Sequence, residues 1–141
     1  MFVLDTNVLS VLMAAQPPRE VAAWVSAQPE DLLFTAAVCQ AEILSGLAVL
    51  PEGRRRSNVE AAARAMFLDD FDGRVLPFDT VAAEGYADMY ARRRRAGRPV
   101  AIADLMIAAI ARVHGASVVT RNITDFDTCG VPILNPWTAK A

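Results

Sequence analysis

The sequence predicts an α/β fold with three layers, in which a central, mostly parallel sheet of four to five strands lies between helices. Short apolar segments alternate along the chain with longer segments of helical periodicity. This alternation favours parallel pairing through right-handed crossovers, which places helices on both faces of the sheet. The length of 141 residues indicates one domain over residues 1–141.

Composition narrows the class of protein. Hydrophobic residues make up 54% of the chain and charged residues 21%, which excludes a disordered chain. The formal net charge is −2, so contact with nucleic acid would require local clusters of cations. The two cysteines lie far apart and form no zinc or disulfide motif. With no transmembrane run and no basic leader, we expect a cytoplasmic protein without membrane contact.

In the first half of the chain, strands are expected at 2–4 and 32–34, and helices at 7–13, 19–28, 36–49 and 57–70. The apolar run 2–4 ends at Asp5, and the helix after it is stopped by two prolines at 17–18. Val21 and Trp24 lie on one face of the next helix. Thr35 is expected to cap the helix at 36–49.

In the second half, strands are expected at 75–76, 117–120 and 132–134, and helices at 80–96 and 101–114. Gly97 and Pro99 end the first of these helices, and Gly115 takes the usual position after the second. Asp5 follows the first strand, and Thr120 ends the fourth. Ligand crevices of open parallel sheets lie beyond the carboxyl ends of the strands, so polar groups from both ends of the chain are expected at one edge.

Asp104 is the most informative residue, because it is the only polar side chain between Val100 and Ala111. A helix that is apolar on nearly all sides is buried, and a buried carboxylate needs a proton, a hydrogen-bonding partner or a cation. The simpler alternative is a carboxylate near the helix start that accepts backbone N–H bonds. Glu42 poses a similar question in the mostly apolar segment 36–50, where a solvated helix face is the alternative.

Taken singly, Asp5 fits a helix cap and Asp125 a turn residue. Gathered in one crevice with Glu42 and Asp104, they would repel by roughly 4 kcal/mol per pair at about 4 Å and a dielectric constant of about 20. An acidic site without histidine or cysteine suits Mg²⁺ or Mn²⁺ better than zinc. Such an ion activates water and stabilises phosphate charge, so the residues favour phosphodiester hydrolysis.

Several motifs, in a fixed order, resemble those of PIN-domain ribonucleases. They are Leu-Asp-Thr-Asn at 4–7, Ala-Glu at 41–42, Ile-Ala-Asp-Leu-Met-Ile-Ala-Ala at 102–109, Val-Thr-Arg-Asn-Ile-Thr-Asp-Phe at 119–126 and Asn-Pro-Trp at 135–137. The chain looks most similar to the FitB-like branch of the VapC toxins of bacterial toxin–antitoxin pairs. The resemblance implies a PIN fold, Mg²⁺-dependent cleavage of RNA with Mn²⁺ as a substitute, a cognate antitoxin, a homodimer, and contact with operator DNA only through the antitoxin.

The resemblance also implies roles for single residues. The first three acids of the family fall on Asp5, Glu42 and Asp104, and Asp5 and Asp104 would hold the metal directly or through water. The fourth acidic position falls on Asn122 or Asp125; with Asp125, the expected catalytic set has four acids. Supporting roles are expected for Thr6, Thr120 and Asn122.

Five arginines lie within seven residues, at 92–95 and 98. A solvated helix end explains them most simply, and contact of part of the set, Arg92 and Arg95, with RNA phosphates or with an acidic partner segment is the functional alternative. Arg121, just after the fourth strand, is a further candidate for substrate contact. His114 is the only histidine and stands at a helix end, which excludes a metal-free ribonuclease that uses two histidines.

Two other functions are alternatives to the ribonuclease. A FitB-like subunit of a DNA-binding toxin–antitoxin complex, with weak or no nuclease activity, stays open because Asn122 carries no charge where relatives often have Asp. A phosphatase of the haloacid-dehalogenase type requires Asp-x-Asp after the first strand, and Asp5-Thr6-Asn7 lacks the second acid.

Overall fold

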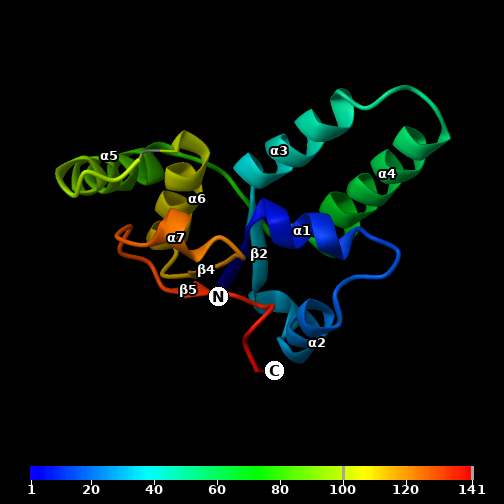
Figure 1. Cartoon of the computed structure of the whole chain (residues 1–141), viewed down its shortest axis with the longest axis horizontal. Helices are drawn as coiled ribbons and strands as arrows, with labels where there is room; N and C mark the ends of the chain where they lie inside the picture. The colour runs from blue at the N-terminus through cyan, green and yellow to red at the C-terminus, as the bar shows by residue number, and fades with distance from the viewer. Residues whose placement is uncertain (100, 141) are drawn as a thin grey trace.

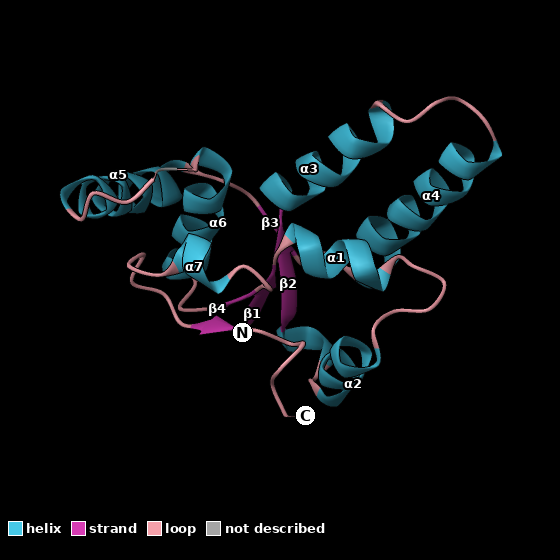
Figure 2. Cartoon of the chain, in the orientation of Figure 1, coloured by secondary structure: helices cyan, strands magenta, loops and turns pink. Residues whose placement is uncertain are grey.

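The computed structural model describes residues 1–99 and 101–140, so Val100 and Ala141 lie outside the described residues. In chain order the elements are β1 (Phe2–Leu4), α1 (Thr6–Leu12), α2 (Arg19–Ala27), the 3-10 helix η1 (Glu30–Leu32), β2 (Leu33–Ala36), α3 (Ala37–Ala48), α4 (Arg54–Ala65), the π-helical turn η2 (Met66–Asp70), β3 (Val75–Leu76), α5 (Thr80–Arg95), α6 (Ile102–Val113), β4 (Ser117–Val119), α7 (Ile123–Phe126) and β5 (Ile133–Leu134) (Figure 2).

The five strands form one parallel sheet in the order β3-β2-β1-β4-β5. β1 is the central strand, and Leu4 pairs with Thr35 of β2 on one side and with Val119 of β4 on the other. The chain extends the sheet first through β2 and β3, and later in the opposite direction through β4 and β5. The direction in which successive strands are added to the sheet therefore reverses between β1 and β4, and open α/β sheets form a ligand crevice at such a point.

Helices cover both faces of the sheet, as the sequence predicts. Figure 1 shows α1, α2 and α4 on one side of the strands and α5, α6 and α7 on the other. The α3 helix leaves the carboxyl end of β2 and projects beside α4 (Figure 1). The carboxyl ends of β1 and β4 thus lie between the starts of α1, α3 and α6.

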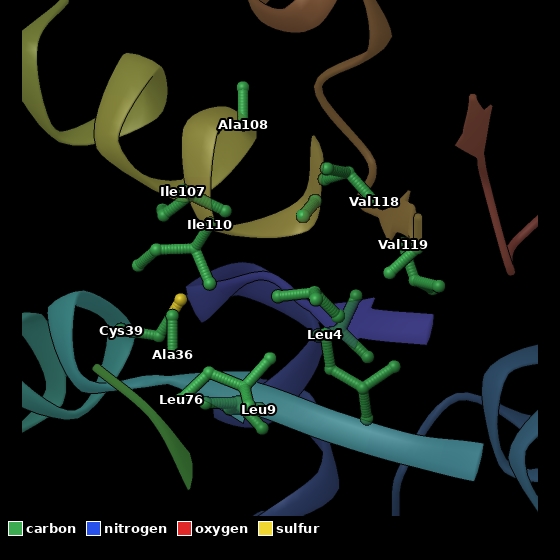
Figure 3. Close-up of a cluster of buried hydrophobic side chains, with 14 of the residues drawn as sticks. Leu4, Leu9, Ala36, Cys39, Leu76, Ile107, Ala108, Ile110, Val118 and Val119 are labelled. Atoms are coloured by element: carbon green, nitrogen blue, oxygen red, sulfur yellow. The ribbon is translucent and has the colours of Figure 1, made fainter. Parts of the chain in front are cut away.

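One part of the core lies between the central strands and α6, and another part lies under α1, α2 and α4. Ile107 and Ile110 of α6 are fully buried and are directed toward Leu4 and Cys39 (Figure 3). Burying a side chain of this size stabilises the fold by about 1.5–3 kcal/mol. This packing holds α6, and the acid in its first turn, at a defined place over the sheet.

Three local expectations differ from the structure. Thr35 does not cap α3: it lies within β2, and its hydroxyl donates to the Leu4 carbonyl oxygen at 2.8 Å. The α4 helix begins at Arg54, three residues before the expected start. Asp125 lies in the short helix α7 rather than in an isolated turn. Among the described helices, none combines the length and apolar character needed to cross a membrane.

Candidate functional site

Asp5 occupies the position where β1 ends and α1 begins. Its backbone N–H donates to the Val119 carbonyl oxygen at 2.9 Å, which extends the pairing of β1 and β4 by one residue. Its Oδ1 accepts from the Thr6 N–H at 2.8 Å, as the cap of α1. Its Oδ2 accepts from the Thr120 hydroxyl at 2.8 Å and from Asn7 Nδ2 at 3.2 Å. The residue is only 5% exposed, so these bonds fix the carboxylate in place.

The Thr120 hydroxyl is the centre of this network. It donates to Asp5 and accepts from Asn7 Nδ2 at 3.1 Å and from the Asn122 N–H at 3.0 Å. A hydroxyl has one donor and two acceptor sites, and all three are used. Asn7 Oδ1 also accepts from the Arg121 N–H at 3.2 Å. The network therefore joins the ends of β1 and β4.

Asn7 is a site residue that the sequence reasoning did not single out. It belongs to the Leu-Asp-Thr-Asn segment and stands two residues after Asp5, which is the one signal that pointed to it. In the structure its amide contacts both Asp5 and Thr120, as well as the backbone of Arg121. It orients Asp5 through bonds that a hydrophobic residue could not make.

Glu42 reaches the same edge of the sheet from α3. Its side chain is exposed, as the solvated-face alternative requires, and its Oε1 accepts from the Thr6 hydroxyl at 2.7 Å. Thr6 thus contacts Asp5 through its backbone and Glu42 through its side chain. Thr6, for which the resemblance implies a supporting role, therefore bridges two of the four acids directly.

Asp104 lies in the first turn of α6 and is partly buried. This turn is less buried than the apolar pattern predicts, since Ile102 is 66% exposed. No side chain caps α6 at Ala101, and Asp104 is the acid of its first turn, where the N-terminus of a helix favours negative charge. Asp125 lies on α7 and is exposed.

The acids act on one another electrostatically. Partial burial, reinforced by the charges of Asp5, Asp125 and Glu42, raises the pKa of Asp104 to about 6, while Arg93 opposes the rise. The pKa of Asp5 is raised mainly by burial and further by Glu42 and Asp125, against the lowering effect of its hydrogen bonds from Thr120 and Thr6. Four carboxylates from four separate segments therefore share one region of negative potential.

The oxygen-rich site fits a hard divalent ion held through few protein ligands. Over the described ranges, no three His, Cys, Asp or Glu side chains lie close enough to hold an ion among themselves. Mg²⁺ keeps several waters and needs only one or two carboxylates, so a site of separated acids suits it. Burial and the Asp5 charge raise the pKa of the Cys39 thiol to about 12, so this side chain is a neutral thiol in the metal-free protein.

The candidate substrate-binding arginines lie in different surroundings. The Arg121 guanidinium stacks over the Trp137 ring at 5.1 Å, while its backbone belongs to the network at Asp5. Arg92 is exposed and pairs with Asp88 at 3.4 Å. Arg95 is exposed near the end of α5. The interpretation of 92–95 as a solvated helix end fails at Arg93, which is only 4% exposed.

In metal-free protein, Asp104→Asn is expected to raise stability at pH 8. Because the pKa of Asp104 is raised from 3.8 to about 6, stability falls as pH rises through that window and stays reduced above it. Removing the charge should recover about 1 kcal/mol after solvent screening, or a few degrees in Tm. Thermal unfolding with a chelator should show a larger gain at pH 8 than at pH 5.

The matched control is Asp72→Asn, an exposed acid just before β3 at the opposite edge of the sheet, which should leave Tm unchanged. A lower Tm for Asp104→Asn, or the same gain at both pH values, would contradict the electrostatic account of this site.

Known proteins are similar to this chain over nearly its whole length. The profile of the PIN domain family matches residues 2–128. The chain is 43% identical to "VapC ribonuclease Y4jK" of Sinorhizobium fredii over 137 residues, which cover 97% of this chain and 98% of that one. It is 34% identical to "Toxin FitB" of Neisseria gonorrhoeae, over 97% of this chain and 99% of the relative.

Among solved structures, FitAB bound to an IR36 DNA fragment superimposes with a TM-score of 0.91 at 33% identity. The match covers 100% of this chain and 99% of the other. The similarity therefore extends over all the elements that carry the four acids.

Proposed function

The chain belongs to the PIN domain family, among the VapC and FitB toxins of toxin–antitoxin systems, and from this premise we propose that it is a magnesium-dependent endoribonuclease neutralised by a cognate antitoxin. The observation that carries the proposal is the group of four acids at the switch point between β1 and β4, where burial, reinforced by repulsion from the other acids, raises the pKa of Asp104 to about 6. A hard divalent ion relieves this repulsion, and Mn²⁺ would substitute for Mg²⁺. We take residues 1–141 as a single PIN domain.

In this proposal the four acids have two different roles. Asp5 and Asp104 would hold the ion directly or through water, and a bound ion would supply activation of water and stabilisation of phosphate charge. Glu42 and Asp125 would accept hydrogen bonds from the attacking water, and one of the two carboxylates would take up its proton. Thr6, Asn7 and Thr120 hold Asp5 in its orientation.

Asp125 rather than Asn122 supplies the fourth acid. The charge of Asp125 helps to raise the pKa of both Asp5 and Asp104, which supports this proposal. Asn122 contributes its backbone N–H to Thr120, and it therefore supports the network instead of adding charge.

The proposed partners follow from the same relatives. One relative is a VapC ribonuclease, so RNA is the proposed substrate, and Arg121 is the best placed of the candidate arginines because its backbone joins the network at Asp5. Arg92 and Arg95 are proposed to contact phosphates farther along the RNA. We propose that the protein forms a homodimer and reaches operator DNA only through its antitoxin.

A second function is favoured by one comparison. One of the similar solved structures is FitAB bound to an IR36 DNA fragment, and Asn122 adds no charge to the site. A subunit of a DNA-binding complex with weak or no nuclease activity would share these features. RNA cleavage by the isolated chain separates the two functions.

The test uses the purified chain and defined RNAs with Mg²⁺, with Mn²⁺ and with a chelator. We expect cleavage with either ion and none with the chelator, and the product of the neighbouring gene should bind the chain and suppress cleavage. Equal cleavage with and without metal would contradict the metal-dependent mechanism. Absence of cleavage with both ions, in protein that binds its partner, would favour the DNA-binding alternative.

A further inference from the structure

Arg93, near the end of α5, is a buried cation with four polar contacts to two other segments. Its Nε and Nη2 donate to the Pro99 carbonyl oxygen at 3.2 and 2.9 Å. Its Nη1 donates to the Asp127 carbonyl oxygen at 2.7 Å and lies 3.4 Å from Asp127 Oδ1. A buried guanidinium loses its hydration, so these contacts must replace it.

The two segments that Arg93 joins are those that carry two of the acids. Pro99 lies five residues before Asp104, in the turn that leads into α6, and Asp127 lies two residues after Asp125, at the end of α7. Arg98 reinforces the second attachment, since its Nη2 donates to Asp127 Oδ1 at 2.7 Å. No described backbone hydrogen bond links these two segments. Side chains join them instead: Arg98, next to Pro99, also donates to the Thr124 carbonyl oxygen at 3.3 Å, and the buried Arg93 guanidinium contacts both segments from α5.

The planar fork of arginine matters for this arrangement. Its donors point in fixed, different directions, so one side chain can bond a carbonyl on each of two segments. A lysine keeps the charge but has one compact ammonium group, which cannot reproduce the same set of bonds.

We propose that Arg93 is a positioning residue of the acidic site: its guanidinium ties the entry to α6 to the exit from α7 and thereby sets the placement of Asp104 relative to Asp125. This inference rests on the proposed function, because it assigns Arg93 to the same site. Arg93 itself contacts neither the RNA nor the metal.

The experiment compares Arg93→Gln and Arg93→Lys with Arg94→Gln. Arg94 is the neighbouring exposed arginine, lies over the Tyr90 ring at 5.9 Å, and provides the control for loss of one charge from the same helix. We expect both Arg93 variants to lose about 10- to 100-fold in kcat and in Mn²⁺ affinity, the size typical of residues that orient metal ligands, with KM unchanged. Arg94→Gln should match the parent in all three quantities.

Hydrogen exchange of the metal-free protein provides a readout that does not depend on activity. The Leu105 N–H donates to the Ala101 carbonyl oxygen and the Asp127 N–H to the Ile123 carbonyl oxygen, both at 3.1 Å. Arg93→Gln should speed exchange at these two amides together and leave the Leu9 amide of α1 unchanged. Asp127→Ala removes the carboxylate but keeps the backbone carbonyl that Arg93 contacts, so it should speed exchange at the same amides to a smaller extent. This variant tests the positioning role of Arg93 even if the Arg93 variants do not fold.

The inference would be overturned if the Leu105 and Asp127 amides of Arg93→Gln exchanged at the same rate as in the parent protein. It would also be overturned if Arg93→Lys kept the full kcat and Mn²⁺ affinity, because the charge alone would then suffice. A parent protein that neither binds Mn²⁺ nor cleaves RNA would overturn the proposed function instead, while faster exchange in Arg93→Gln would still support the tie between the two segments.

Discussion

Asp104→Asn is expected to reduce magnesium-dependent RNA cleavage by about 1000-fold. A bound metal contributes several kcal/mol of transition-state stabilisation, and each 1.4 kcal/mol corresponds to about tenfold in rate. Asp104 is a proposed ligand whose pKa is raised by burial and by the other acids, so the variant removes a charge that the ion would neutralise. The measurement is the initial rate of cleavage of a defined RNA at saturating Mg²⁺, with parent and variant at equal concentration.

The same substitution separates loss of function from loss of structure. Asparagine at this position should stabilise the metal-free fold, as argued above, so reduced cleavage cannot be attributed to unfolding. Mg²⁺ should raise the Tm of the parent and not that of the variant. Asp72→Asn should behave as the parent in both assays. Cleavage by Asp104→Asn within threefold of the parent would exclude Asp104 from the site.

Thr120→Val is expected to have the largest effect on stability, about 2–4 kcal/mol. Valine has nearly the same shape as threonine, but it leaves Asp5 Oδ2, Asn7 Nδ2 and the Asn122 N–H each with one partner fewer. A buried group without its partner costs about 1–3 kcal/mol, and bonds to charged groups are at the upper end. Urea unfolding should show the loss, and Tm should fall by about 10 °C.

Two further variants give this experiment its controls. Thr35→Val removes an equally buried hydroxyl from the same sheet, but that hydroxyl makes one bond, to the Leu4 carbonyl oxygen, so a loss of about 1 kcal/mol is expected. Thr120→Ser keeps the hydroxyl and should retain most of the stability and of the cleavage. Equal losses in Thr120→Val and Thr35→Val would contradict the central role of Thr120.

The layered fold could be predicted because its signals are local. Apolar runs of strand length alternate with segments of helical period, and the parallel sheet covered on both faces follows from that alternation. Position in the chain also placed Asp5 and Thr120 together, since both follow strands whose carboxyl ends share an edge. Pairing of Leu4 with Val119 confirms this neighbourhood.

Other features required contacts between distant segments. Thr35 has the side chain of a helix cap, yet strand pairing next to Leu4 uses its hydroxyl inside the sheet. Four consecutive arginines look alike in sequence, and only the packing of α5 against α6 and the 122–130 segment buries Arg93 alone. Asn7 likewise gained its role from partners 113 and 114 residues away.

Residue order alone determined the kinds of secondary structure, their succession and the acids that the chain can offer, because helix and strand periods depend on neighbours a few positions apart. Folding in three dimensions decided which polar groups meet: Thr120 with Asp5, Thr6 with Glu42, and Arg93 with the segments on either side of two acids. Hydrogen bonds act over about 3 Å whatever the separation along the chain, so such partners emerge only when the strands and helices are packed together.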